Sequence, residues 1–247
     1  MTGALLVVAA VLYGLGVRRF DAAHPNEPFP RRWAAAFAGG LVVAAAAVVG
    51  PLDRLAGERL SWHMLQHLML LMVAPPLLLM GRPVLLARRA APSATRRALV
   101  RGLRSGLAGA LTHPVTGWVC LAVVLWATHF TALYQAALTS GPVHALEHGL
   151  YLGAGLLFWF PVVGAEPSPR RLGHPARMLY LFVAAPAGAL LASTLYQAER
   201  VLYRAYEGPG ALADQRAAGA VMWIGGGLLF LAAVLLVAAS WASGTTT

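Results

Sequence analysis

The stretch from Trp62 to Met80 reads WHMLQHLMLLMVAPPLLLM and contains no Asp, Glu, Lys or Arg. A helix needs roughly 20 mostly apolar residues to cross the hydrocarbon core of a bilayer. The two prolines near its end are tolerated in a membrane helix when neighbouring groups satisfy the freed backbone carbonyls. The stretch therefore predicts a membrane-spanning helix that begins with two histidine side chains.

The rest of the chain has the same apolar character. Of its 247 residues, 59% are hydrophobic and 11% are charged, whereas a soluble domain has about 45 to 50% apolar and about 25% charged residues. This composition excludes a water-soluble globular protein. The 19 Lys or Arg positions are all arginine, which excludes chemistry that needs a lysine amine. Cys120 is the one cysteine, so any metal must be held by histidine, methionine or carboxylate side chains.

Seven apolar runs are separated by clusters of arginine, proline and glycine, and each is of about membrane-spanning length. They are residues 2–17, 33–51, 62–80, 114–133, 143–163, 178–198 and 216–241. The first run has no basic residues before it, unlike a secretory signal peptide, and is expected to remain as a helix. We therefore predict an all-α integral membrane protein, a seven-transmembrane helix bundle that forms a single domain over residues 1–247.

The arginines are distributed unequally between the two sides of this predicted bundle. The first, third and fifth loops hold Arg18, Arg19, Arg31, Arg32, Arg82, Arg88, Arg89, Arg96, Arg97, Arg101, Arg104, Arg170, Arg171 and Arg177. The opposite side has only Arg54, Arg59, Arg200, Arg204 and Arg216. Because short arginine-rich loops stay in the cytoplasm, the N-terminus is predicted outside and the C-terminus in the cytoplasm.

The positions of the arginines also predict which partners the chain has. Arginines in short loops between apolar spans do not form the basic surface of a soluble fold, so no nucleic-acid partner is expected. Residues 92–111 of the third loop place four arginines beside leucine and valine at helical spacing. This amphipathic stretch is predicted to lie on the cytoplasmic membrane surface, against anionic lipid headgroups.

Five of the eight histidines fall at the predicted outer ends of the third, fourth and fifth spans: His63, His67, His129, His144 and His148. His63 and His67 are four residues apart, as are His144 and His148, so each pair lies on one face of its helix. Two imidazoles at this spacing present two nitrogen atoms to one metal ion. Ionisable groups in membrane helices are costly and usually functional. The two pairs are therefore predicted to bind metal at the extracytoplasmic side, in one site or in two linked sites.

Other side chains near these histidines are candidates to complete a metal site. Four of them are predicted as additional ligands: His129, Met64, Asp214 and Met222. Gln66 and Glu147 are predicted to hydrogen-bond the ligands from behind. Imidazole suits copper, zinc, iron and nickel, whereas a thioether favours Cu(I). Copper, as Cu(I) or Cu(II), is therefore the predicted metal, with zinc and haem as alternatives.

Motifs spread over most of the chain resemble those of one family. They are Trp62 to His67, Ala74 to Leu77, Gly81 to Pro83, His129-Phe130 with Tyr134, His144 to His148, Asp214-Gln215, Gly219 and Met222-Trp223. From residue 30 to residue 240 the sequence resembles the CtaG family of multi-pass bacterial cytochrome c oxidase assembly proteins.

This resemblance implies a caa3-type oxidase assembly factor of the bacterial plasma membrane, and not an enzyme. It implies that the chain binds copper at the outer face and assists its delivery to an oxidase copper centre. The implied partners are a haem-copper oxidase subunit or another copper carrier, together with membrane lipid. The implied metal ligands are His63, His67, His144 and His148.

Two other classes of function would use the same histidines. The first is a membrane haem- or zinc-dependent enzyme, because His144-Ala-Leu-Glu147-His148 is close to the inverted zinc motif H-x-x-E-H. The second is a metal transporter or a structural partner of a membrane complex. Transport needs polar groups through the bilayer midplane, and the inner halves of the predicted spans are almost wholly apolar.

Overall fold

Helices make up the structure throughout the described residues. A computed structural model of the chain describes residues 2–130, 132–164 and 172–244. In chain order the helices are α1 (Thr2–Ala23), α2 (Arg31–Val48), α3 (Pro51–Glu58), α4 (Leu60–Leu68), η1 (Met69–Val73), α5 (Ala74–Met80), α6 (Pro83–Ala90), α7 (Ser93–Leu103), α8 (Gly106–Leu111), α9 (Pro114–Phe130), α10 (Ala132–Thr139), α11 (Gly141–Val163), α12 (His174–Gln197), η2 (Arg204–Tyr206), α13 (Ala211–Ala220), η3 (Val221–Gly225) and α14 (Gly226–Ala242). No strand occurs in these residues, which confirms the predicted all-α class.

Within the described residues, six helices are long and apolar enough to cross a membrane by length and composition: Gly3–Ala23, Arg31–Glu58, Leu60–Ala90, Gly141–Val163, His174–Gln197 and Ala211–Ala242. The fourth predicted span forms α9, a shorter apolar helix of 17 residues. At about 1.5 Å per residue, α9 is shorter than a hydrocarbon core of about 30 Å. The chain is therefore a multi-pass membrane protein with six long candidate spans, where the sequence predicted seven.

Several helix boundaries differ from the predicted ones for local physical reasons. The second run continues past residue 48 as α3, because Pro51 starts a new helix at a position where its missing N–H is not needed. The last long helix begins at Ala211, earlier than predicted. The amphipathic stretch 92–111 forms two helices, α7 and α8. They are separated because Ser105 caps α8, accepting a hydrogen bond from the Ala108 N–H at 3.2 Å.

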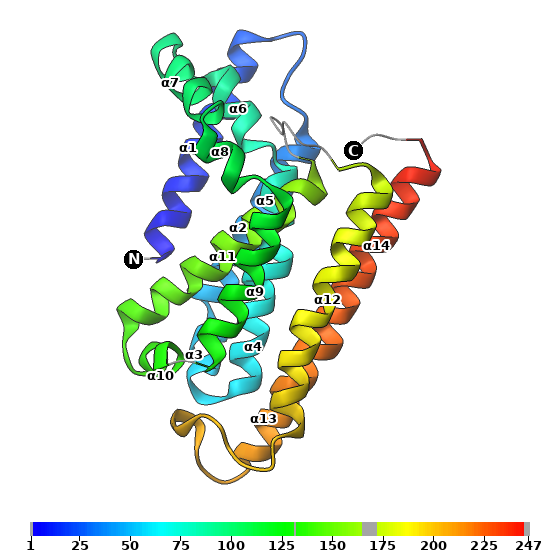
Figure 1. The fold of residues 1–247 in the computed structure, drawn as a ribbon. Coiled ribbons are helices and arrows are strands. Elements are labelled where there is room, and N and C mark those ends of the chain that lie inside the picture. Colours follow the sequence, from blue (N-terminus) through cyan, green and yellow to red (C-terminus); the bar gives the residue numbers. More distant parts are fainter. Residues whose placement is uncertain (1, 131, 165–171, 245–247) are drawn as a thin grey trace.

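The connections between helices divide between the two ends of the bundle. The segment after α1, helices α6 to α8 and the last turn of α14 lie at one end, and α3, α10 and α13 lie at the other (Figure 1). The arginine-rich first and third loops therefore lie at the same end of the bundle as the last turn of α14 (Figure 1). The distribution of arginines predicts that these segments lie on one side of the membrane. Arg170 and Arg171 of the predicted fifth loop lie outside the described residues.

Helix α11 packs against a proline kink in the helix that carries the first histidine pair. Pro75 has no N–H to donate to the Leu71 carbonyl four residues earlier, and the segment before it, η1, is π-helical. Trp159 of α11 donates its indole N–H to that freed carbonyl at 3.0 Å. A side chain at Gly155 would place its Cβ 2.6 Å from Pro75 Cγ. Glycine at this position therefore permits the close approach that brings α11 beside the histidine-bearing helix.

Most buried polar side chains belong to α4, the last turn of α9 and the first turns of α11 and α13. They are His63, Gln66, His67, Thr128, His129, Glu147, His148 and Gln215. These segments adjoin α3 and α10, which lie at the same end of the bundle as α13 (Figure 1). Arg177 near the opposite end is the exception among the described residues. Elsewhere the core consists of apolar side chains such as Phe158, Leu181 and Leu191. The polar cluster therefore occupies one part of the bundle.

Candidate metal centre

The four histidines of the two predicted pairs form one cluster. The ring centroids of His63 and His67 are 4.3 Å apart, and those of His144 and His148 are 4.1 Å apart. Across the pairs, the His63 and His144 centroids are 5.4 Å apart, and those of His67 and His148 are 6.4 Å apart. His144 is half-buried and the other three are buried. Helices α4 and α11 thus bring together residues that are far apart in the sequence.

Each histidine pair lies against a carboxylate from a different helix. His63 and His67 of α4 group with Glu147 of α11, and the Glu147 Oε2 atom lies 3.7 Å from the Nε2 atom of each. We call these three residues the buried triad. Glu147 is therefore placed among the candidate ligands themselves, whereas the sequence predicted it behind them.

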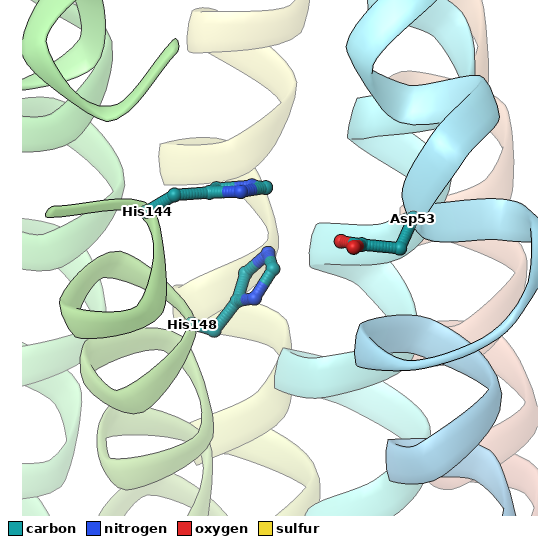
Figure 2. A group of neighbouring side chains, drawn as sticks. All are labelled: Asp53, His144 and His148. Atoms are coloured by element: carbon teal, nitrogen blue, oxygen red, sulfur yellow. The ribbon is translucent and has the colours of Figure 1, made fainter. Parts of the chain in front are cut away.

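The second group is formed by Asp53, His144 and His148, which we call the outer triad. Figure 2 shows the Asp53 carboxylate of α3 directed at the two imidazoles of α11. Within each triad the candidate ligand atoms all lie within 4.8 Å of one another. Both triads thus combine two imidazole nitrogens with one carboxylate oxygen, a set that binds divalent transition metals.

Several nitrogen and oxygen atoms of these residues, which could each ligate a metal, are buried without a hydrogen-bond partner among the described residues. They are His63 Nε2, His67 Nδ1, His67 Nε2, His144 Nε2, His148 Nε2, Glu147 Oε1 and Glu147 Oε2. A buried polar group without a partner costs about 1 to 3 kcal/mol. One such atom in a protein is unremarkable, whereas a cluster of nitrogen and oxygen donors fits a site for a cation.

Hydrogen bonding assigns the tautomer of His63. The Tyr206 hydroxyl donates to the Ala56 carbonyl at 2.7 Å, so its oxygen accepts from His63 Nδ1 at 3.2 Å. Burial raises the pKa of the Tyr206 phenol, which therefore keeps its proton. With the proton on Nδ1, the Nε2 atom of His63 presents a lone pair towards Glu147. A hydrogen bond behind the imidazole is the usual way of orienting a histidine that ligates metal.

Gln66 positions Asp53, the candidate ligand that the sequence did not reveal. The Gln66 side-chain amide donates to Asp53 Oδ1 at 2.9 Å and to the Ala47 carbonyl at 2.6 Å. The sequence predicted Gln66 behind the histidine ligands, whereas its amide hydrogen-bonds Asp53. The sequence holds one signal for Asp53: it is a carboxylate on the same predicted side of the membrane as the histidines. No spacing rule connects Asp53 to His144 and His148, which lie 91 and 95 positions later.

His129 and Met64 lie beside the buried triad as a pair of soft donors. His129 Nδ1 is 2.7 Å from the Leu125 carbonyl, which can only accept, so Nδ1 carries the proton. The bare Nε2 atom then faces the sulfur of Met64 at 3.4 Å, and a thioether has no proton to donate. The His129 and His67 ring centroids are 6.1 Å apart. An imidazole nitrogen and a thioether suit Cu(I).

Asp214 and Met222 lie apart from both triads. Asp214 accepts from the Leu60 N–H at 2.7 Å and from the Ser61 hydroxyl at 2.5 Å, so its carboxylate caps the start of α4. Met222 is partly buried in η3 and packs against the apolar core. Asp214 therefore positions the helix that carries His63 and His67, and its oxygens are occupied by that role.

Comparisons with known proteins give the family. Residues 11–243 match the family described as cytochrome c oxidase caa3 assembly factor (Caa3_CtaG). Uncharacterized proteins of Mycobacterium bovis, Mycobacterium tuberculosis and Mycobacterium leprae are each 27% identical over 196 residues. Each match covers 74% of this chain and 30% of the relative, so the chain spans less than a third of the relatives' length. No solved structure matches the chain. Because the family match extends over nearly the whole sequence, the chain belongs to the cytochrome c oxidase caa3 assembly factor family.

Proposed function

We propose that this assembly factor is a copper metallochaperone. It binds copper on the extracytoplasmic side of the bacterial plasma membrane and passes it to a copper centre of a haem-copper oxidase. The receiving partner is an oxidase subunit or another copper carrier. Copper is cargo in this proposal, and the chain catalyses no reaction on it.

The observation that carries this proposal is the cluster of buried nitrogen and oxygen atoms that have no hydrogen-bond partner among the described residues. In the buried triad, His63 Nε2, His67 Nε2 and the carboxylate of Glu147 converge from two helices. A cation bound there would satisfy all of them at once and offset their burial. The chain's single cysteine excludes a thiolate cage, and a site without thiolates is suited to a carrier that must release its ion.

The neighbouring soft donors favour copper over other metals. Two histidines and a carboxylate also suit zinc and non-haem iron, so the triad alone does not select the ion. His129 Nε2 and Met64 Sδ provide a nitrogen and a thioether within the same cluster. Zinc and iron(II) gain little from a thioether, whereas Cu(I) gains much.

The direction of Glu147 supports a binding role in preference to zinc peptidase chemistry. In the inverted zinc motif, the two histidines and the glutamate of one helix act on the same ion. Here Glu147 groups with His63 and His67 of the other helix, while His144 and His148 group with Asp53. The largely apolar core beyond the cluster supports a site open to one side and does not favour a transport path.

The proposal is tested in cells whose oxidase depends on this chain. Changing both His63 and His67 to alanine is expected to leave the purified oxidase with much less copper, because the buried triad loses both nitrogens. Elemental analysis of the oxidase measures this directly. The matched control changes His113 and His174 to alanine, which removes two histidines outside both triads. Full copper content in the oxidase of the His63→Ala/His67→Ala cells would overturn the proposal.

A further inference from the structure

We infer that the centre binds two metal ions, one in each triad, and that the outer triad is where the ion enters and leaves. This inference rests on the proposed function, because it takes copper as the cargo. It concerns how the protein loads, a property that the family match does not specify.

The outer triad is a complete ligand set in its own right. Asp53, His144 and His148 bring three candidate ligand atoms within 4.8 Å of one another, from α3 and α11 (Figure 2). His144 Nε2 and His148 Nε2 are buried without a hydrogen-bond partner among the described residues. Gln66 holds the Asp53 carboxylate in place through Oδ1. These three residues therefore fit an ion independently of the buried triad.

One ion does not account for all six residues. A tetrahedral copper or zinc ion takes four protein or solvent ligands, whereas the two triads offer four imidazoles and two carboxylates. The triads share no residue, and each has its own carboxylate to balance the charge of a cation. The His63 and His144 rings, one from each triad, lie 5.4 Å apart and nearly parallel. Two neighbouring ions therefore fit the cluster better than one.

The two triads differ in their access to the surface. His63, His67 and Glu147 are 1%, 4% and 0% exposed. In the outer triad, His148 is also buried, at 4% exposed, whereas Asp53 and His144 are only half-buried. Three ligands leave the fourth position of a tetrahedral ion open for exchange. An ion arriving from outside thus meets the outer triad first, and the adjacent buried triad retains the ion more firmly because water is excluded.

The number of bound ions tests this inference. The purified chain is titrated with Cu(II), and the wild type is expected to bind one ion per triad. Asp53→Asn is expected to halve the copper bound per chain at equilibrium. The buried triad is still expected to fill, but more slowly than in the wild type, because the ion no longer passes through an intact outer triad. Electron paramagnetic resonance of the loaded wild type is expected to show dipolar coupling between neighbouring Cu(II) ions, and Asp53→Asn is expected to abolish it. Glu58→Gln on the same helix α3 is the matched control, because Glu58 is exposed and belongs to neither triad.

Each other outcome has a definite meaning. A wild type that binds a single ion with no coupling, and an Asp53→Asn variant that binds the same amount, would overturn the inference and leave the proposed function standing. A folded Asp53→Asn variant that binds no copper even at equilibrium would show one shared site and would also overturn the inference. If Asp53→Asn fails to fold, His144→Ala provides the same test from α11. A wild type that binds no copper overturns the proposed function itself.

Discussion

Changing both His63 and His67 to alanine is expected to lower the copper affinity of the buried triad more than about 100-fold. Altering even a hydrogen-bonding partner behind a ligand costs about 10- to 100-fold in metal affinity, and this change removes two ligands. Only Glu147 of the buried triad would remain. The measurement is copper binding by the purified chain in competition with a chelator of known affinity.

The control for this change separates lost ligands from lost folding. His113→Ala/His174→Ala removes the same number of imidazoles from outside both triads and is expected to bind copper like the wild type. The helical circular dichroism signal of both variants is expected to match that of the wild type. Unchanged copper affinity in the His63→Ala/His67→Ala variant would show that the buried triad does not bind copper.

Changing Glu147 to glutamine is expected to abolish most of the stabilisation that the folded protein gains when copper binds to the buried triad. A ligand present at 100 times its dissociation constant stabilises the folded state by about 2.7 kcal/mol. Glutamine keeps the size of the side chain but removes the charge that faces His63 and His67 at 3.7 Å. The wild type is therefore expected to unfold at a distinctly higher temperature with copper than without it. For Glu147→Gln, the rise in unfolding temperature on adding copper is expected to be much smaller.

The same variant separates metal binding from zinc peptidase chemistry. If Glu147 were a general base, Glu147→Gln would keep its metal and lose only a hydrolytic activity. Metal content and the copper-dependent unfolding temperature are therefore measured on one preparation, with Glu58→Gln as the control. Retention of both by Glu147→Gln would contradict a role for this carboxylate as a ligand.

The sequence predicted the histidine cluster because the signal is local. A spacing of four residues puts His63 with His67, and His144 with His148, on one face of a helix whatever its tertiary context. The side of the membrane on which these helix ends lie is predicted from the arginine content of the loops between spans. Helix class and the approximate position of each apolar run are likewise set by composition over about 20 residues.

The carboxylate partners were harder to predict because they depend on how helices rotate and pack. Asp53 reaches the α11 histidines only because the chain bends after α2 and restarts as α3 at Pro51. Glu147 lies beside His144 and His148 in the sequence but faces the histidines of α4. Asp214 and Met222 are both predicted from the sequence as additional ligands, yet Asp214 caps the distant start of α4. No periodicity within one helix contains that information.

X-ray absorption at the copper edge of the loaded wild-type chain tests the central claim most directly. We expect a copper ion whose first shell is dominated by nitrogen and oxygen, with the scattering pattern of imidazole rings. The expected metal-to-nitrogen distance is about 2.0 to 2.1 Å, as in other histidine sites. A first shell made of sulfur alone, or a chain that retains no copper for the measurement, would contradict it.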